Sequence, residues 1–141
     1  MRIGILSVNG KYLSLASLYI AFIYYLSSLP GSVLGKDTNV SRLISNLFHI
    51  PLFGILSLLL LFAFKGNHNS SGNLKMANIL SFLLTVIYAF FDEWHQTFAK
   101  GRMFSLFDVC LDTVGCAFFL AGYTVFRHKN EICRNNAINK R

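Results

Sequence analysis

Apolar residues are gathered into four long stretches that are separated by short polar segments. The stretches cover about residues 12–29, 43–64, 74–91 and 104–126. Each has roughly the 17–25 residues that a helix needs to cross the hydrocarbon core of a bilayer. Polar residues inside the stretches recur every three or four positions, which is helical spacing. The pattern predicts an all-α polytopic membrane protein with four transmembrane helices in one bundle.

The composition agrees with a chain that lies mostly in lipid. Hydrophobic residues make up 54% of the 141 residues and charged residues 13%, about half of the roughly 25% charge of a soluble domain. This balance excludes a disordered chain, a collagen-like repeat and an ordinary cytosolic enzyme. We expect one membrane domain, residues 1–126, followed by a basic cytoplasmic tail, residues 127–141. The first stretch is expected to be a retained span, because no A-x-A signal-peptide cleavage site follows it.

The net charge of +7 is distributed as in a membrane protein, and we expect no nucleic-acid partner. Nine Lys and Arg residues lie in the N-terminus, the second loop and the tail, whereas four lie in the first and third loops. Cytoplasmic loops carry an excess of Lys and Arg, so both termini are expected in the cytoplasm and the first and third loops outside. The three cysteines lack paired spacing, which indicates neither a disulfide framework nor a zinc knuckle.

Ionisable residues gather around the short outward loop between the third and fourth stretches. Four of the six acidic residues, Asp92, Glu93, Asp108 and Asp112, lie within 21 positions. A carboxylate at the bilayer centre costs about 2.5–3.5 kcal/mol on insertion scales, so several of them near one membrane face need a reason.

Helical spacing places polar residues on one face of each stretch, and these faces are expected to meet inside the bundle. Their ionisable ends would then form a polar, acidic pocket that opens outward. The faces comprise Ser14, Ser17, Ala21, Tyr24 and Ser28 in the first stretch, Arg42, Ser45, Asn46 and His49 in the second, Ser81, Thr85, Tyr88, Asp92 and His95 or Gln96 in the third, and Ser105, Asp108, Asp112 and Gly115 in the fourth.

A structural interpretation of the same residues stays open. The four carboxylates could be balanced by Arg42, Lys100 and Arg102, with His49 and His95 adjusting the charge. Such a network would fasten the third loop and fix helix register, because polar side chains also hold membrane helices together.

Several of these residues belong to motifs that resemble the VanZ-like family of small bacterial membrane proteins. The motifs are S-S-L-P-G at residues 27–31, His49 with F-G-I-L at residues 53–56, and Y-A-F-F-D-E-W-H-Q-T-F at residues 88–98, followed by Gly101-Arg102, Ser105, Asp108 and Gly115. They resemble the family pattern D-E-x-x-Q-x-F…G-R…S-x-x-D…N-x-x-G and cover about residues 10–126. One position departs from it, because Asp112 stands where the family usually has Asn.

The resemblance implies a four-span protein of the bacterial cell envelope, in the inner membrane, and the founding member of the family is associated with resistance to the glycopeptide teicoplanin. We therefore expect the pocket to bind a lipid-linked cell-wall precursor head group or a glycopeptide. Arg102 would contact a phosphate or carboxylate as a bidentate fork. The candidate ligand-binding residues are His49, Asp92, Glu93, Gln96, Arg102, Asp108 and Asp112.

Other functions were weighed on the same residues. Asp108, Asp112 and Asp92 could hold Mg²⁺ in a membrane-embedded enzyme that acts on a phosphorylated lipid, with Arg102 neutralising charge and His49 or His95 carrying protons. A zinc site of His49, Glu93 and His95 is disfavoured, because residues two apart lie roughly 200° apart around a helix. A helper role beside a larger envelope enzyme is a third possibility. No cofactor and no metal site are predicted, and beyond membrane lipids no protein partner is indicated.

Overall fold

The structure is a computed structural model that describes residues 2–3, 6–31, 39–65 and 71–138, with side chains described for residues 8–31, 47–65 and 74–138. Two short antiparallel strands, β1 (Arg2–Ile3) and β2 (Leu6–Ser7), precede four helices. The helices are α1 (Gly10–Ser28), α2 (Asn39–Lys65), α3 (Ser71–Gln96) and α4 (Leu106–Ile138). The hydrophobic pattern thus predicts the helices and their order, but not the strand pair.

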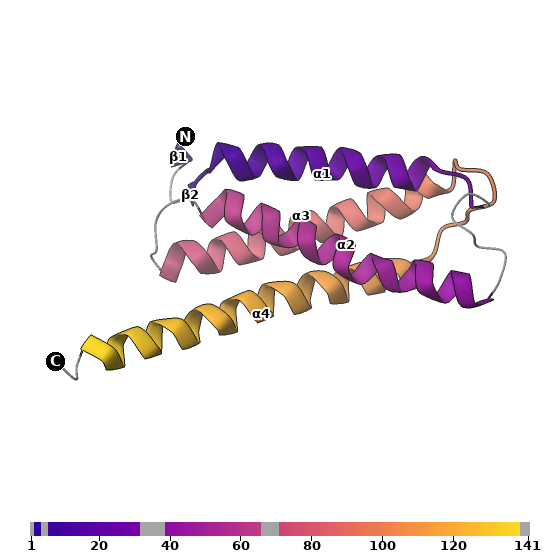
Figure 1. The fold of residues 1–141 in the computed structure, drawn as a ribbon. Coiled ribbons are helices and arrows are strands. Elements are labelled where there is room, and N and C mark those ends of the chain that lie inside the picture. The colour runs from indigo at the N-terminus through magenta and orange to yellow at the C-terminus, as the bar shows by residue number, and fades with distance from the viewer. Residues whose placement is uncertain (1, 4–5, 32–38, 66–70, 139–141) are drawn as a thin grey trace.

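The helix α2 is central to the bundle. It packs against α1, α3 and α4, whereas α1 and α4 do not touch within the described parts of the chain. The helices run alternately in opposite directions, and both termini lie at the same end (Figure 1). At the opposite end, here called the distal end, α1 and α3 finish and α2 and α4 begin (Figure 1). Residues far apart in the sequence are therefore brought together there.

Three helical segments are long and apolar enough to cross a membrane, not four as expected. They are Leu47–Lys65, Leu74–Gln96 and Leu106–Ile138. The helix α1 forms where the sequence predicts it and ends before Pro30, but it is not among the candidate spans found in the described residues. Its 19 residues include Lys11, four tyrosines and four serines, which dilute its apolar character.

The helix α4 continues to Ile138, beyond the boundary at residue 126 between the expected span and the expected tail. No Gly or Pro interrupts residues 123–138, and Arg127 Nε donates to Glu131 Oε1 over 2.9 Å, one turn later. A helix of 33 residues is roughly 50 Å long, compared with about 30 Å for the bilayer core. Its C-terminal part extends past the other helices (Figure 1).

Polar side chains of α2, α3 and α4 face the interior, and large apolar side chains cover the outside. Ser81, Thr85, Asp92 and Asp112 are buried, whereas Phe118 is 71% exposed. The expected interior-facing polar stripes are therefore confirmed for α3 and α4, and for α2 at His49. The side chains of Arg42, Ser45 and Asn46 lie outside the described residues.

The expected interior face of α1 is wrong. Ser17 and Ser28 are exposed, and α1 instead buries Ala16, Ile23 and Ser27. The exposed serines need no interior partner, because Ser17 donates to Leu13 O over 3.0 Å and Ser28 donates to Tyr24 O over 2.7 Å. Such local bonds satisfy a hydroxyl without help from another helix.

Candidate functional site

The seven predicted ligand-binding residues gather at the distal end and are here called the polar cluster. Six are buried, with at most 6% of each residue's surface exposed, and Arg102 is half-buried. The helix α2 supplies one residue, α3 supplies three, the α3–α4 loop supplies one and α4 supplies two. In that order the members are His49; Asp92, Glu93 and Gln96; Arg102; Asp108 and Asp112.

His49 and Asp112 form the central pair of the cluster. His49 Nδ1 lies 3.0 Å from Asp112 Oδ1, and both side chains are buried. The pair joins α2 to α4 close to where the two helices cross. A Cβ built on Gly115 would lie 2.8 Å from Ile50 Cα, so the glycine is needed for this close approach. An aspartate here offers the imidazole a charged oxygen acceptor, whereas an asparagine would offer a neutral one.

Asp92 and Gln96 lie one helical turn apart on α3 and are bonded to each other. Gln96 Nε2 donates to Asp92 Oδ2 over 2.8 Å. Ser27 of α1 donates to the backbone oxygen of Asp92 over 3.5 Å and lies 3.3 Å from His95 Nδ1. His95 also contacts the ring of Tyr24, with centroids 4.2 Å apart. His95 therefore faces α1 rather than the cluster. Ser27 connects His95 to Asp92 of the cluster, a role that its motif in the sequence did not indicate.

Glu93 fixes the start of α4. Its Oε2 accepts a 3.0 Å hydrogen bond from Ser105 N, and Ser105 Oγ accepts a 3.2 Å bond from Asp108 N. Ser105 thus caps the N-terminus of α4 while the carboxylate of α3 holds the capping residue. Asp108 lies in the first turn of α4, where the helix dipole favours negative charge.

Arg102 holds the end of α1. Its guanidinium donates to Ser27 O over 3.0 Å and to Leu26 O over 3.5 Å. Both carbonyls lie in the last turn of α1, where regular helical donors run out, and Leu26 O also accepts a 3.2 Å hydrogen bond from Leu29 N. Nearby, Gly31 N donates to Lys100 O over 3.1 Å. Gly101 has a positive φ of 77°. The first and third loops are therefore clasped together.

Burial lowers the pKa of the Arg102 guanidinium, and the nearby carboxylates of Asp92, Glu93 and Asp108 oppose this. Among the described residues, however, Arg102 makes no ion pair with them within 4.0 Å, and Lys100 is exposed. The structure therefore supports the fastening of the third loop. The charge balance as a whole is not tested, because the side chain of Arg42 lies outside the described residues.

Five polar atoms of the cluster are buried without a hydrogen-bond partner among the described residues. Buried acceptors and donors are normally satisfied, so each such atom needs an explanation. The orphaned atoms are Asp92 Oδ1, Glu93 Oε1, Arg102 Nε, Asp108 Oδ1 and Asp112 Oδ2.

One set of residues in the cluster has the geometry to hold a metal. His49, Glu93 and Asp108 each offer a ligand atom, and these atoms lie within 4.8 Å of one another. This set differs from the zinc set and from the Mg²⁺ set that the sequence suggests. Compared with the zinc set, Asp108 replaces His95. The three aspartates of the Mg²⁺ set do not form a group with closely spaced ligand atoms within the described residues.

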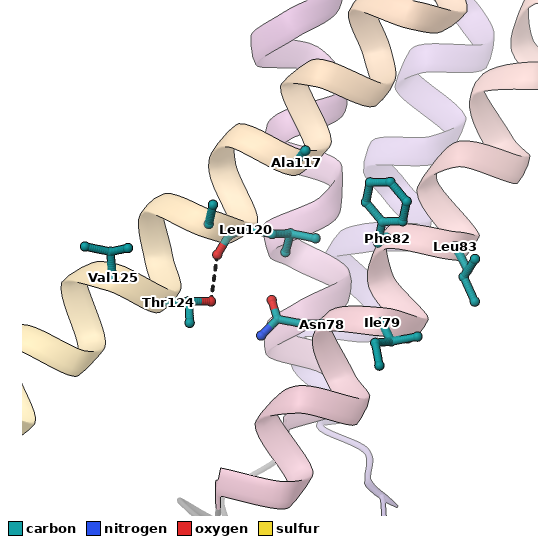
Figure 2. Close-up of a pocket in the computed structure, with 9 residues that line it drawn as sticks. Asn78, Ile79, Phe82, Leu83, Ala117, Leu120, Thr124 and Val125 are labelled. Atoms are coloured by element: carbon teal, nitrogen blue, oxygen red, sulfur yellow. Dashed lines mark hydrogen bonds between the residues drawn. The ribbon is translucent and has the colours of Figure 1, made fainter.

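A second feature, which sequence reasoning missed, is an apolar cleft of about 500 Å³ between α3 and α4. Figure 2 shows Asn78 on α3 facing Thr124 on α4 across it. The Thr124 hydroxyl is used within α4, where it donates to Leu120 O over 2.8 Å. The cleft is lined by Asn78, Ile79, Phe82, Leu83, Ala117, Leu120, Ala121, Thr124 and Val125.

Among the comparisons with known proteins, one family model matches most of the chain. Residues 8–127 match the sequence pattern of the VanZ/LLP1 family, a range that contains the whole polar cluster. No curated protein and no solved structure matches the chain significantly. Since the matched range is nearly the whole chain and three helices can span a membrane, the chain is a membrane protein that belongs to the VanZ/LLP1 family.

Proposed function

We propose that this VanZ-like protein is a four-span protein of the bacterial inner membrane whose polar cluster binds the polar head group of a lipid-linked cell-wall precursor. Both termini lie in the cytoplasm in this proposal, and the distal end faces outward. The excess of Lys and Arg at the ends of the chain supports this orientation. The resemblance to a family associated with teicoplanin resistance supports a link to glycopeptide sensitivity.

The packing of α1 supports its assignment as the fourth span. It lies alongside α2 and α3, and large apolar side chains cover its outer face. Leu15 is 50% exposed, Leu18 69% and Phe22 49%. An apolar helix face that no protein segment covers is favourable in lipid and unfavourable in water.

The observation that carries the proposal is the set of orphaned carboxylate oxygens. Each buried acceptor without a donor costs about 1–3 kcal/mol, and four of them lie in one cluster. A ligand rich in hydroxyl, amide or ammonium donors would satisfy them. Sugar and peptide head groups of envelope precursors have this chemistry, and their lipid chains would stay in the bilayer beside the helices.

The test is to identify the lipids that remain bound to the purified protein. The full chain and the Asp92→Asn variant would be purified in mild detergent, and the bound lipids measured by mass spectrometry. Glu131→Gln is the matched control, since Glu131 lies on the C-terminal part of α4 and pairs with Arg127. We expect a head-group-bearing envelope lipid to be enriched on the wild type and the control and depleted on Asp92→Asn.

The same lipids would be followed in cells that lack the protein. The teicoplanin sensitivity of these cells would be measured as well. If the wild type restores it and Asp92→Asn, expressed at an equal level, does not, the proposal extends to the drug. A wild-type protein that carries only bulk phospholipid, in the same proportions as Asp92→Asn, would contradict it. A lipid species that accumulates on deletion would favour the enzyme alternative.

A further inference from the structure

We propose that His49, Glu93 and Asp108 form a binding site for one divalent metal ion of the Zn²⁺ or Mn²⁺ type. The three residues come from three different helices, α2, α3 and α4, and all are buried. Their ligand atoms lie within 4.8 Å of one another. Ligand atoms on one ion at about 2.0–2.2 Å lie roughly 3–4 Å apart, so side-chain adjustments of about an ångström would close the site.

Unpartnered buried oxygens provide a second and independent observation. Glu93 is fully buried and Asp108 is 6% exposed. Glu93 Oε1 and Asp108 Oδ1 have no hydrogen-bond partner in the described part of the chain. A cation satisfies a carboxylate oxygen for which no protein donor is at hand. An ion on these two oxygens would leave Asp92 Oδ1 and Asp112 Oδ2 for donors of the head group.

The groups around the three residues orient them as the outer partners of a metal site do. Asp112 Oδ1 lies 3.0 Å from His49 Nδ1, which leaves Nε2 of the imidazole for an ion. Ser105 N occupies Glu93 Oε2, which leaves Oε1. Carboxylate–histidine and amide–carboxylate contacts of this kind fix the direction of metal ligands and raise their basicity.

The charge of the cluster favours the same conclusion. Four carboxylates are buried there with one guanidinium, which is bonded to backbone carbonyls of α1. A divalent ion would offset two of the carboxylates. Buried charges persist when they are paired or coordinate a metal.

The ligand set selects the class of ion. Mg²⁺ prefers oxygen ligands alone and strict octahedral geometry, whereas an imidazole with two carboxylates suits Zn²⁺ or Mn²⁺. Three protein ligands leave at least one coordination position open. An ion with an open position would accept a phosphate oxygen. The contact between the ion and a phosphate oxygen deepens the proposed function and rests on it. The binding of the metal ion to the three residues does not depend on lipid.

The test uses the full chain in detergent, stripped with a chelator and then titrated with Mn²⁺ and Zn²⁺. We expect about one ion per chain by elemental analysis, with excess Mg²⁺ competing weakly. Pulsed electron paramagnetic resonance of bound Mn²⁺ should show coupling to an imidazole nitrogen. Glu93→Gln and Asp108→Asn should weaken binding by more than the 10–100-fold typical of outer partners. Glu131→Gln should leave it unchanged.

Two measurements keep the test decisive if a ligand variant does not fold. The nitrogen coupling is read on the wild type, and Asp112→Asn should fold and weaken binding by about 10–100-fold. Sub-stoichiometric Mn²⁺ without nitrogen coupling, or equal affinity in wild type and Asp108→Asn, would overturn the metal site. Stoichiometric metal on a protein without an envelope lipid would contradict the proposed function alone.

Discussion

His49 and Asp112, which are separated by 63 positions in the sequence, meet in a buried hydrogen bond of 3.0 Å between α2 and α4. Among the described residues, this bond connects the cluster residue of α2 directly to a carboxylate of α4. Asp112, the position that departs from the resembled family pattern, therefore contacts His49, another member of the cluster.

Replacing Asp112 tests how much this hydrogen bond contributes to the stability of the protein. Asp112→Ala leaves the imidazole without its partner in a buried site, so we expect a loss of about 1–3 kcal/mol in the free energy of unfolding. Asp112→Asn keeps an oxygen acceptor and should lose less. The measurement is unfolding in mixed detergent micelles, followed by circular dichroism. Equal stability of the alanine variant and the wild type would show that the bond contributes nothing.

The crossing of α2 and α4 depends on Gly115. A Cβ at this position would lie 2.8 Å from Ile50 Cα, a backbone atom that cannot rotate away. We expect Gly115→Ala to cost about 1–3 kcal/mol through overpacking, in the same unfolding measurement.

Gly122 offers a matched control for that substitution. It lies on the same helix, and a Cβ there would meet nothing within 4 Å. Gly122→Ala should therefore be neutral, or stabilising by up to about 1 kcal/mol through helix propensity. Similar effects of the two alanine substitutions would contradict the close crossing.

The clasp between the first and third loops depends on the fork of Arg102. Lysine keeps the charge but cannot reproduce the planar geometry with which Arg102 reaches Leu26 O and Ser27 O. We expect Arg102→Lys to cost about 0.5–1.5 kcal/mol. The exposed Lys100 side chain gives the control, since Lys100→Ala leaves its backbone oxygen available to Gly31. Equal melting temperatures for the lysine variant and the control would refute the clasp.

The topology can be tested with single cysteines in a background without Cys110, Cys116 and Cys133. Lys11, Lys100 and Lys129 are exposed in the structure, so a cysteine at each should react wherever it meets water. In intact cells, a membrane-impermeant thiol reagent should label Lys100→Cys but neither Lys11→Cys nor Lys129→Cys. Labelling of Lys11→Cys with protection of Lys129→Cys would show that α1 does not span the membrane.

Much of the fold follows from the hydrophobic pattern, because spacing along a helix determines which residues share a face. That reasoning places Asp92 and Gln96 together on α3, and Asp108 and Asp112 together on α4, as the structure has them. The same reasoning fails for α1. Ser17 and Ser28 are satisfied by carbonyls of their own helix, so their positions carry no information on which side of α1 is buried.

The membership of the candidate metal set could not be predicted, because spacing does not reveal how one helix is rotated against another. Glu93 and His95 are close in sequence, yet Glu93 faces α4 and His95 faces Tyr24 and Ser27 of α1. Asp108 reaches His49 and Glu93 only because α4 begins where α3 ends in space. The cleft between α3 and α4 likewise depends on the divergence of two helix axes, which the sequence pattern does not record.

The polar cluster is divided unequally between the two halves of the chain. The hairpin of α1 and α2 contributes His49, whereas the hairpin of α3 and α4 contributes all four carboxylates, Gln96 and Arg102. Because the first hairpin is synthesised before the second, we expect the acidic groups to reach the bilayer before they meet the histidine. Docking of the hairpins is the step that completes the cluster. If the chain were divided between Lys65 and Ser71, each fragment would hold only part of the polar cluster. The two fragments would have to be expressed together to restore the contact between His49 and Asp112.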